Sequence, residues 1–258
     1  MKQHILALLP LLSINSITMM GALVRVPELK TSASGTRFTQ VSVSSEDERG
    51  RSYLSFSALE GAAERISTVN AGTPMLISAR LEYARYFDKE GVSRESASLL
   101  LNSSRTVEGQ NSRKVLSDDR EPHYTLPGGW VETSLEAIVE GNLGKKSRDD
   151  GEDYTVLRLA FRNPSSEREG SLAYGRIEAV ALGGMADHAA HFAEGTAIKC
   201  EGRVYLKAGR DGKATLKLFI TRLTEISLSI PVAPLESELS ALPEGMPDFD
   251  QDAAPWDL

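Results

Sequence analysis

The sequence predicts an all-β fold of two small five-stranded barrels in tandem, followed by a disordered tail. Three observations lead to this prediction: an internal repeat, an alternation of apolar and polar residues within each copy, and a change of composition after residue 230. The repeat indicates the number of domains. The alternation has the period of strands with one buried face, and the composition marks where the folded part ends.

The internal repeat relates residues 54–81 to residues 177–204 without a gap. LSFSALEGAAERISTVNAGTPMLISARL aligns with IEAVALGGMADHAAHFAEGTAIKCEGRV at a shift of 123 residues, and the apolar positions coincide. This period is too long for one unit of a solenoid. It therefore predicts two copies of one small domain.

Each copy shows the same order of expected elements. Val41 and Val43 alternate with polar residues in copy one, as do Leu157 and Leu159 in copy two, so these side chains are expected to point inward. Strands one, two and three, a short helix that ends near a glycine, and strands four and five form the order of an OB-fold. The first, fourth and fifth strands are expected at about 21–27, 75–87 and 96–103, and at about 135–142, 197–208 and 214–222.

The division of the chain follows from these elements. We expect an N-terminal extension at 1–18, an OB-fold at 19–107, a linker at 108–132, a second OB-fold at 133–230 and a tail at 231–258. The extension has weak signal-peptide character, and a disordered segment or a true start at Met19 or Met20 are the other interpretations. The linker is polar and contains Gly and Pro.

The charge of the chain is concentrated in the tail. The net charge is -7, and residues 231–258 contain seven acids and no Lys or Arg, which leaves 29 acidic and 29 basic groups before residue 231. A neutral body is compatible with a one-sided basic groove. The single Cys200 excludes an intrachain disulfide and is typical of a reducing compartment. No apolar run is long enough to span a bilayer.

Three stretches carry a family likeness: IVEGNLG at 138–144, RIEAVALGGMADHAAHFAEGTAIKCEGRVYL at 176–206, and the acidic tail. The chain resembles the bacterial single-stranded-DNA-binding proteins, in the form with two OB-folds per chain, and copy two is the closer match. The resemblance implies a cytoplasmic, nucleoid-associated protein without enzyme activity or cofactor. Such a protein coats and protects single-stranded DNA during replication, recombination and repair, and two OB-folds per chain imply a homodimer. The resemblance also implies that the tip recruits replication and repair proteins, through Asp248, Phe249, Asp250, Asp252, Trp256, Asp257 and Leu258.

Binding of single-stranded DNA without sequence preference needs cations along the phosphates and flat side chains under the bases. Strand alternation places Tyr53 on the outward face, and Tyr53 and Tyr86 fall where the family carries stacking tryptophans; Arg51 is a further phosphate candidate. Copy one is expected to supply the aromatic platforms and copy two most of the cations. The candidate residues are Arg37, Phe38, Tyr53, Arg80, Arg85, Tyr86, Lys145, Lys146, Arg148, Arg158, Arg162, Arg176, Arg203, Tyr205 and Lys207.

Other interpretations remain open at this point. The tyrosines would also suit barrels that they merely cap, with their hydroxyls in water. The neutral body and scarce aromatics would suit an OB-fold scaffold that binds proteins and little DNA, and residues 1–18 would suit an exported module. His188 and His191 have a spacing that can share a metal, but no third ligand is near in sequence, so no metal is predicted. No Walker A or GxSxG motif is present, so enzyme activity is not expected.

Overall fold

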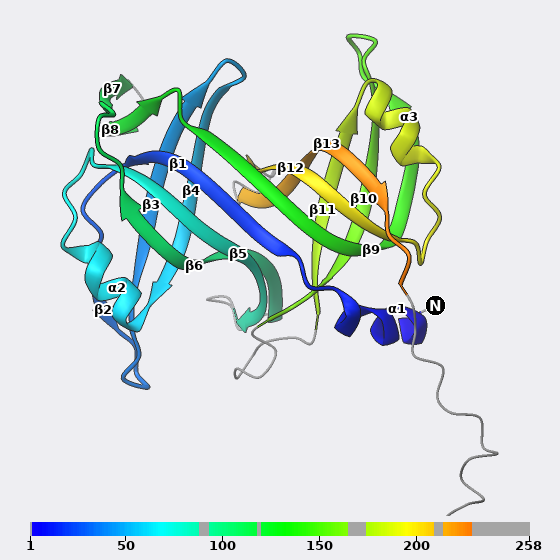
Figure 1. The fold of residues 1–258 in the computed structure, drawn as a ribbon, viewed down its shortest axis with the longest axis horizontal. Helices are drawn as coiled ribbons and strands as arrows, with labels where there is room; N and C mark the ends of the chain where they lie inside the picture. Colours follow the sequence, from blue (N-terminus) through cyan, green and yellow to red (C-terminus); the bar gives the residue numbers. More distant parts are fainter. Residues whose placement is uncertain (1, 88–92, 118–119, 165–173, 209–213, 229–258) are drawn as a thin grey trace, which may run out of the picture. The chain divides into compact units, whose positions relative to one another are not determined.

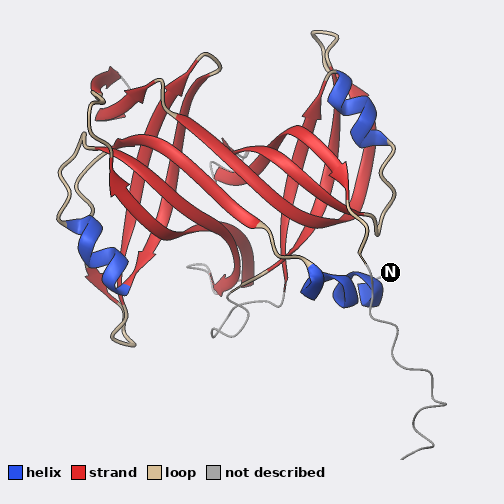
Figure 2. Ribbon diagram, viewed as in Figure 1, coloured by secondary structure: helices blue, strands red, loops and turns tan. Residues whose placement is uncertain are grey.

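The computed structural model describes residues 2–87, 93–117, 120–164, 174–208 and 214–228. Residues 1–228 form one compact unit. Within it, strands form two barrels, and each barrel carries one short helix (Figures 1 and 2). The predicted all-β fold of two OB barrels is confirmed, whereas the predicted tail and its tip lie outside the described residues.

The first barrel closes through a ring of five paired strands. β1 pairs with β3 and β5, β3 with β4, β4 with β6 in parallel, and β6 with β5. The short β2 (Lys30–Thr31) adds to β3. The elements are β1 (Asn15–Leu23), β3 (Arg37–Asp47), β4 (Gly50–Leu59), α2 (Glu60–Ser67), β5 (Pro74–Phe87) and β6 (Ser93–Thr106).

The second barrel repeats this ring. β9 pairs with β10 and β12, β10 with β11, β11 with β13 in parallel, and β13 with β12. The predicted inward residues of both copies are buried: Val41, Val43, Leu157 and Leu159 have 0% exposure. The elements are β9 (Trp130–Ser147), β10 (Asp153–Arg162), β11 (Tyr174–Leu182), α3 (Gly184–Ala190), β12 (Ala197–Ala208) and β13 (Ala214–Glu225).

The first residues of the chain are not a disordered extension, and this corrects the prediction for 1–18. They form α1 (Lys2–Leu8) and the 3₁₀ turn η1 (Leu9–Leu11), and β1 begins at Asn15, before the expected start of the barrel. The apolar stretch that resembled a signal peptide packs on the second barrel, because its side chains cover an apolar patch there. The buried cluster contains Ile5, Leu8, Leu9, Leu12, Ile138, Ala160 and Ala197.

The segment 108–132, expected as a linker, also contains strands. β7 (Arg113–Ser117) and β8 (Arg120–Pro127) form a hairpin, and β8 joins β3 through the parallel pair Ser45 and Leu126. Leu126 has 0% exposure, and the Ser44 hydroxyl donates to the Thr125 hydroxyl at 3.0 Å. The polar composition predicted a loop, but these buried contacts bring the segment into the sheet.

The two barrels are related by an approximate two-fold axis. Leu23 and Val139 are equivalent, because each carbonyl accepts the amide of the glycine after the helix, Gly72 at 2.7 Å and Gly195 at 2.8 Å. Six residues earlier stand Ile17 and Thr133, and these two residues pair with each other in the antiparallel ladder between β1 and β9. The axis therefore passes through this pair, and the two barrels share one sheet.

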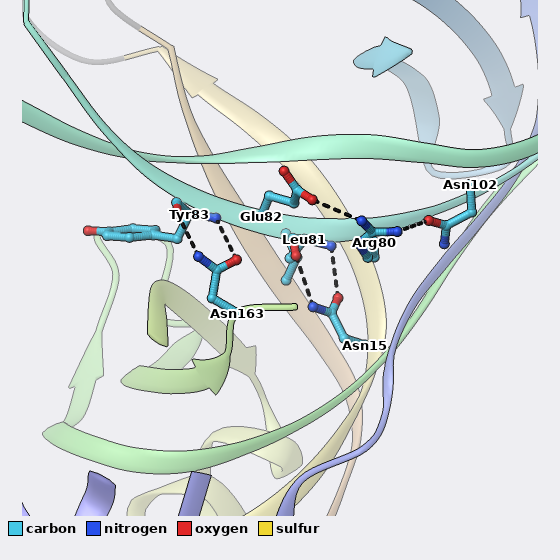
Figure 3. A network of polar contacts seen from close by, with 7 residues as sticks. All are labelled: Asn15, Arg80, Leu81, Glu82, Tyr83, Asn102 and Asn163. Carbon is cyan, nitrogen blue, oxygen red and sulfur yellow. Dashed lines mark hydrogen bonds and ion pairs between the residues drawn. The ribbon is translucent and has the colours of Figure 1, made fainter. Parts of the chain in front are cut away.

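Two asparagine side chains complete the hydrogen bonding of β5 beyond its ladder with β1 (Figure 3). Asn15 accepts from the Leu81 amide at 2.8 Å and donates to its carbonyl at 2.9 Å. Asn163, which follows β10 and is 1% exposed, accepts from the Tyr83 amide at 3.3 Å and donates to its carbonyl at 2.8 Å. The second barrel is thus hydrogen-bonded directly to a strand of the first.

The single thiol is expected to be unreactive in the folded protein. Burial raises the pKa of Cys200 to about 12, so the nucleophilic thiolate is scarce at neutral pH. In the unfolded chain the thiol ionises near pH ~8.5. Between that pH and 12 the folded state holds a proton that the unfolded state has lost, so the free energy of unfolding should fall by about 1.4 kcal/mol per pH unit.

Two measurements check this expectation. Ellman's reagent should label Cys200 only as fast as the chain opens, and fast stoichiometric labelling of the native protein would contradict it. In urea titrations at rising pH, Cys200→Ala should show a smaller loss of stability than the parent between pH ~8.5 and ~10.

Candidate nucleic-acid interface

A groove of about 420 Å³ lies between the two barrels. Arg49, Arg51 and Tyr53 line it from the β3–β4 turn and β4, and Arg203 and Tyr205 line it from β12. We call this site, defined by these five residues, the arginine–tyrosine groove. No acidic side chain is among the described residues that line it.

The two tyrosines reach the groove because each is next to an inward-facing residue of its strand. Tyr53 precedes Leu54, which is 1% exposed, and Tyr53 itself is 37% exposed. Its ring meets the ring of His123 edge-on, with centroids 6.5 Å apart. Tyr205 follows the buried Val204, and partial burial raises the pKa of its hydroxyl. Both rings line the groove, one from each barrel.

The three arginines are held differently. Arg203 Nη1 lies 3.7 Å from Asp47 Oδ2 of the first barrel, and its guanidinium lies 5.6 Å from the centre of the Phe219 ring. Arg51 Nε lies 3.4 Å from Glu46 Oε2. Arg49 is exposed, and within the described ranges no ion pair involves it.

Glu46, one of the two acids beside the groove, forms an ion pair with an arginine from outside the groove. Arg113 Nη2 of β7 lies 2.5 Å from Glu46 Oε2. The Arg113 hydrogen bond is the main reason why the pKa of Glu46 is lowered, with a smaller contribution from Arg51. The hairpin β7–β8 thus supplies a cation that leaves Arg51 less tied to Glu46.

A second inter-barrel groove, of about 440 Å³, has a different lining. Arg176 binds Glu140 with both Nε and Nη2 at 2.9 Å, and Lys217 forms an ion pair with Glu178. We call this site the paired-charge groove. Its charged lining residues are Glu95, Glu140, Arg158, Arg176, Glu178 and Lys217.

The remaining candidates of the first barrel are engaged elsewhere. Arg37 forms ion pairs with Glu60 and Glu64 of α2, so it holds the helix rather than the groove. The other positions are as follows: Phe38 is half-buried on β3; Arg80 contacts Asn102 and Glu82; Arg85 pairs with Glu95; and Tyr86 stands on β5 with its side chain outside the described part.

The remaining candidates of the second barrel are also spread. Lys145 lies 2.7 Å from Asp153 and 2.6 Å from Asp187, and hydrogen bonds to these two acids raise its pKa. Arg162 lines a small pocket against residues 12–15, away from both grooves. Arg148 pairs with Glu152, whereas Lys146 and Lys207 are exposed. Among the candidates whose side chains the structure describes, Tyr53, Arg203 and Tyr205 are the ones brought together in the arginine–tyrosine groove.

Sequence reasoning missed Arg49 and the meeting of the two barrels. Arg49 belongs to the run RGR at 49–51, in a turn between two strands of clear alternation, and that run was the available signal. His188 of α3 and His191, the residue directly after this helix, both face backbone carbonyls: His191 Nδ1 lies 2.6 Å from the Asp187 carbonyl and His188 Nε2 lies 3.2 Å from the Leu223 carbonyl. In the part of the chain that the structure describes, no three His, Cys, Asp or Glu side chains gather as a metal site.

This fold and site define a two-barrel OB-fold protein with a cationic, aromatic groove. Residues 14–107 match the model of the Single-strand binding protein family. This match confirms the resemblance noted above, although it falls on copy one and not on copy two. The first barrel is thus similar to this family, which is named for binding and not for a reaction.

Solved structures show the same two-barrel fold. The single-stranded DNA binding protein from Thermus aquaticus has a TM-score of 0.63 and 16% identity, and the match covers 87% of this chain and 98% of that chain. A deletion variant of the same Thermus aquaticus protein has a TM-score of 0.61 and 17% identity, with 84% and 97% covered. No curated protein matches the chain. Within the described ranges, no helix is long and apolar enough to cross a membrane.

Proposed function

We propose that this protein binds single-stranded DNA without sequence preference, through the arginine–tyrosine groove. The observation that carries the proposal is the convergence of three arginines and two tyrosines from both barrels in one groove, with no acid among the lining residues that the structure describes. The family match of the first barrel and the name of the Thermus aquaticus protein with the same fold support it.

The groove offers partners for the phosphate and for the base of a nucleotide. Guanidinium groups of Arg49, Arg51 and Arg203 bind phosphate oxygens, and a planar guanidinium can present two N–H groups to one phosphate. Tyr53 and Tyr205 provide aromatic surface on which bases stack. Every base has a π-face, so this mode of binding does not read sequence.

Titration with fluorescently labelled oligo(dT) at several salt concentrations tests the proposal. Each phosphate neutralised on a single strand contributes about -0.7 to the slope of log affinity against log salt. We therefore expect binding at low salt and a slope of roughly -2 if the three arginines of the groove act together. Absence of binding at low salt, or an affinity that salt does not change, would contradict the proposal.

We propose that the cellular role is coating and protection of single-stranded DNA during replication, recombination and repair. The arrangement proposed is a homodimer with four OB-folds, in the cytoplasm and on the nucleoid. The tip with Phe249, Trp256 and Leu258 is proposed to recruit replication and repair enzymes, since it combines acids with hydrophobic residues. The domain limits proposed are residues 14–107 and 130–228 for the two barrels, with the hairpin β7–β8 between them.

Removal of residues 231–258 should tighten DNA binding at low salt. The seven acids of this segment compete with phosphate for the groove arginines, so their loss raises the affinity most where screening is weak. Anisotropy titrations of the full chain and of the chain ending at residue 230 compare the two affinities. Equal affinities at low salt would refute the competition.

An OB-fold protein-interaction scaffold is the second candidate function. Leu116 on β7 favours it, because this side chain is 77% exposed on the outer strand of the hairpin. The oligo(dT) titration separates the two functions: a scaffold binds no DNA at low salt.

A further inference from the structure

The approximate two-fold axis relates the two grooves to each other. Tyr53 and Arg176 are equivalent, since each stands directly before the repeat that begins at Leu54 and Ile177. Both line their grooves together with that neighbouring apolar residue. The chain thus carries the same inter-barrel site twice, and the two sites differ in their side chains.

The bridges between the barrels follow the same relation. Val41 pairs with Phe56 and Leu157 with Ala179, so six residues further on Asp47 is equivalent to Asn163. Asp47 reaches the other barrel through Arg203, and Asn163 reaches the other barrel through the Tyr83 backbone. The charged bridge belongs to the arginine–tyrosine groove and the neutral bridge to the paired-charge groove.

The two grooves differ in the charges of their described lining residues. The described lining of the arginine–tyrosine groove has three cations and no acid, whereas the paired-charge groove has three of each. The equivalent cross-strand pairs of the two barrels differ in the same way. Arg158 stands opposite Glu178 in the second barrel. In the first barrel Ser42 stands opposite Ser55, and their hydroxyl oxygens are 3.2 Å apart.

A phosphate that entered the paired-charge groove would meet two carboxylates that already bind Arg176 and Lys217, and of the described lining cations only Arg158 has no ion pair. The phosphate would have to separate Arg176 from Glu140 and Lys217 from Glu178, and would leave both carboxylates beside itself. Affinity of a strand for a protein comes largely from counterions released when phosphates are neutralised. A groove without net positive charge releases few, and like charges in a partly enclosed site repel.

We propose that each chain offers only one of its two equivalent inter-barrel grooves to single-stranded DNA, and that Glu140 and Glu178 exclude phosphate from the other. This inference rests on the proposed function. It makes the two carboxylates determinants of specificity at a site that the fold would otherwise duplicate. Arg158 and Arg176, which the sequence predicted as phosphate-binding residues, then do not contact the DNA.

Arg49→Ala and Arg158→Ala form a matched pair that tests the proposal. Each residue is exposed and lines one groove, and within the described ranges neither has an ion pair. With an oligo(dT) of about eight nucleotides, inside the range of ~4–16 nucleotides per OB-fold, Arg49→Ala should weaken binding and reduce the magnitude of the salt slope by about 0.7. Arg158→Ala should leave both unchanged. Equal losses from the two variants would overturn the proposal.

The double variant E140Q/E178Q tests the exclusion itself. Gln keeps the size of Glu, and removal of two negative charges leaves three cations and Glu95 in the groove. We expect a second oligonucleotide per chain, and we expect that Arg158→Ala now abolishes it. Unchanged stoichiometry with a folded double variant would overturn the proposal, and the matched pair decides it if the double variant does not fold. Failure of the parent to bind any oligonucleotide would refute the proposed function, which is a distinct outcome.

Discussion

Replacing Tyr53 and Tyr205 together by Ala is expected to weaken oligo(dT) binding by about 2–6 kcal/mol, because each stacked base contributes about 1–3 kcal/mol. This corresponds to at least about a 30-fold loss of affinity. The two rings come from different barrels and line the same groove. Their loss should leave the salt slope almost unchanged, because the groove arginines remain and phosphate neutralisation determines the slope.

Anisotropy titrations of the parent, the double Ala variant and a double Phe variant check this expectation. Phe retains the aromatic face and loses only the hydroxyl, so Tyr53→Phe with Tyr205→Phe should bind nearly as tightly as the parent. If the Ala and Phe variants lose affinity equally, the hydroxyls and not the ring faces contact the strand. If neither loses affinity, the strand does not occupy this groove.

Phe161→Ala should lower the free energy of unfolding by about 3–5 kcal/mol, since the ring is fully buried and its removal leaves a cavity. The ring occupies space that only a glycine at position 175 leaves open. A Cβ atom built on Gly175 would clash with the Phe161 ring and would lie 2.7 Å from Tyr83 Cβ. Gly175→Ala alone should therefore also destabilise the protein, by about 1–3 kcal/mol, as overpacking does.

Urea denaturation of the two single variants and their combination checks this packing. The added methyl group at position 175 has more room once the ring is gone, so the combined loss should be smaller than the sum of the single losses. Phe161→Leu, which keeps an apolar side chain, should lose less than Phe161→Ala. Strictly additive losses would show that the ring and Gly175 are not in contact.

The barrels were predictable because alternation is a local property of each strand. Val41 and Leu157 revealed their inward faces through their own neighbours, and the repeat then supplied the number of domains. The N-terminal segment and residues 108–132 were not predictable in the same way. Leu8 is buried only because Ile138 and Ala160 meet it, and Leu126 only because β3 pairs with its strand. Such partners are more than 75 residues away along the chain.

The candidate site was predictable only in part, for a related reason. Outward register identified Tyr53, Arg203 and Tyr205 correctly as surface residues of their strands. The same rule also selected Arg37 and Arg176, because register does not show which acid stands across a strand or on a neighbouring helix. Arg37 meets Glu64 of α2, and Arg176 meets Glu140 of β9. Which cations are available to a ligand depends on these pairings.

The packing of the first helix on the last barrel has a consequence for biosynthesis. Ile5 and Leu8 are made before the residues that cover them, and one of these, Ala197, is made about 190 residues later. At ~5–20 residues per second this interval lasts roughly 10–40 s. In the second half of that time, after β6 has been made, the first barrel can already be complete while this apolar helix still lacks part of its cover. Folding of the second barrel therefore ends the exposure of this segment to chaperones and to other nascent chains.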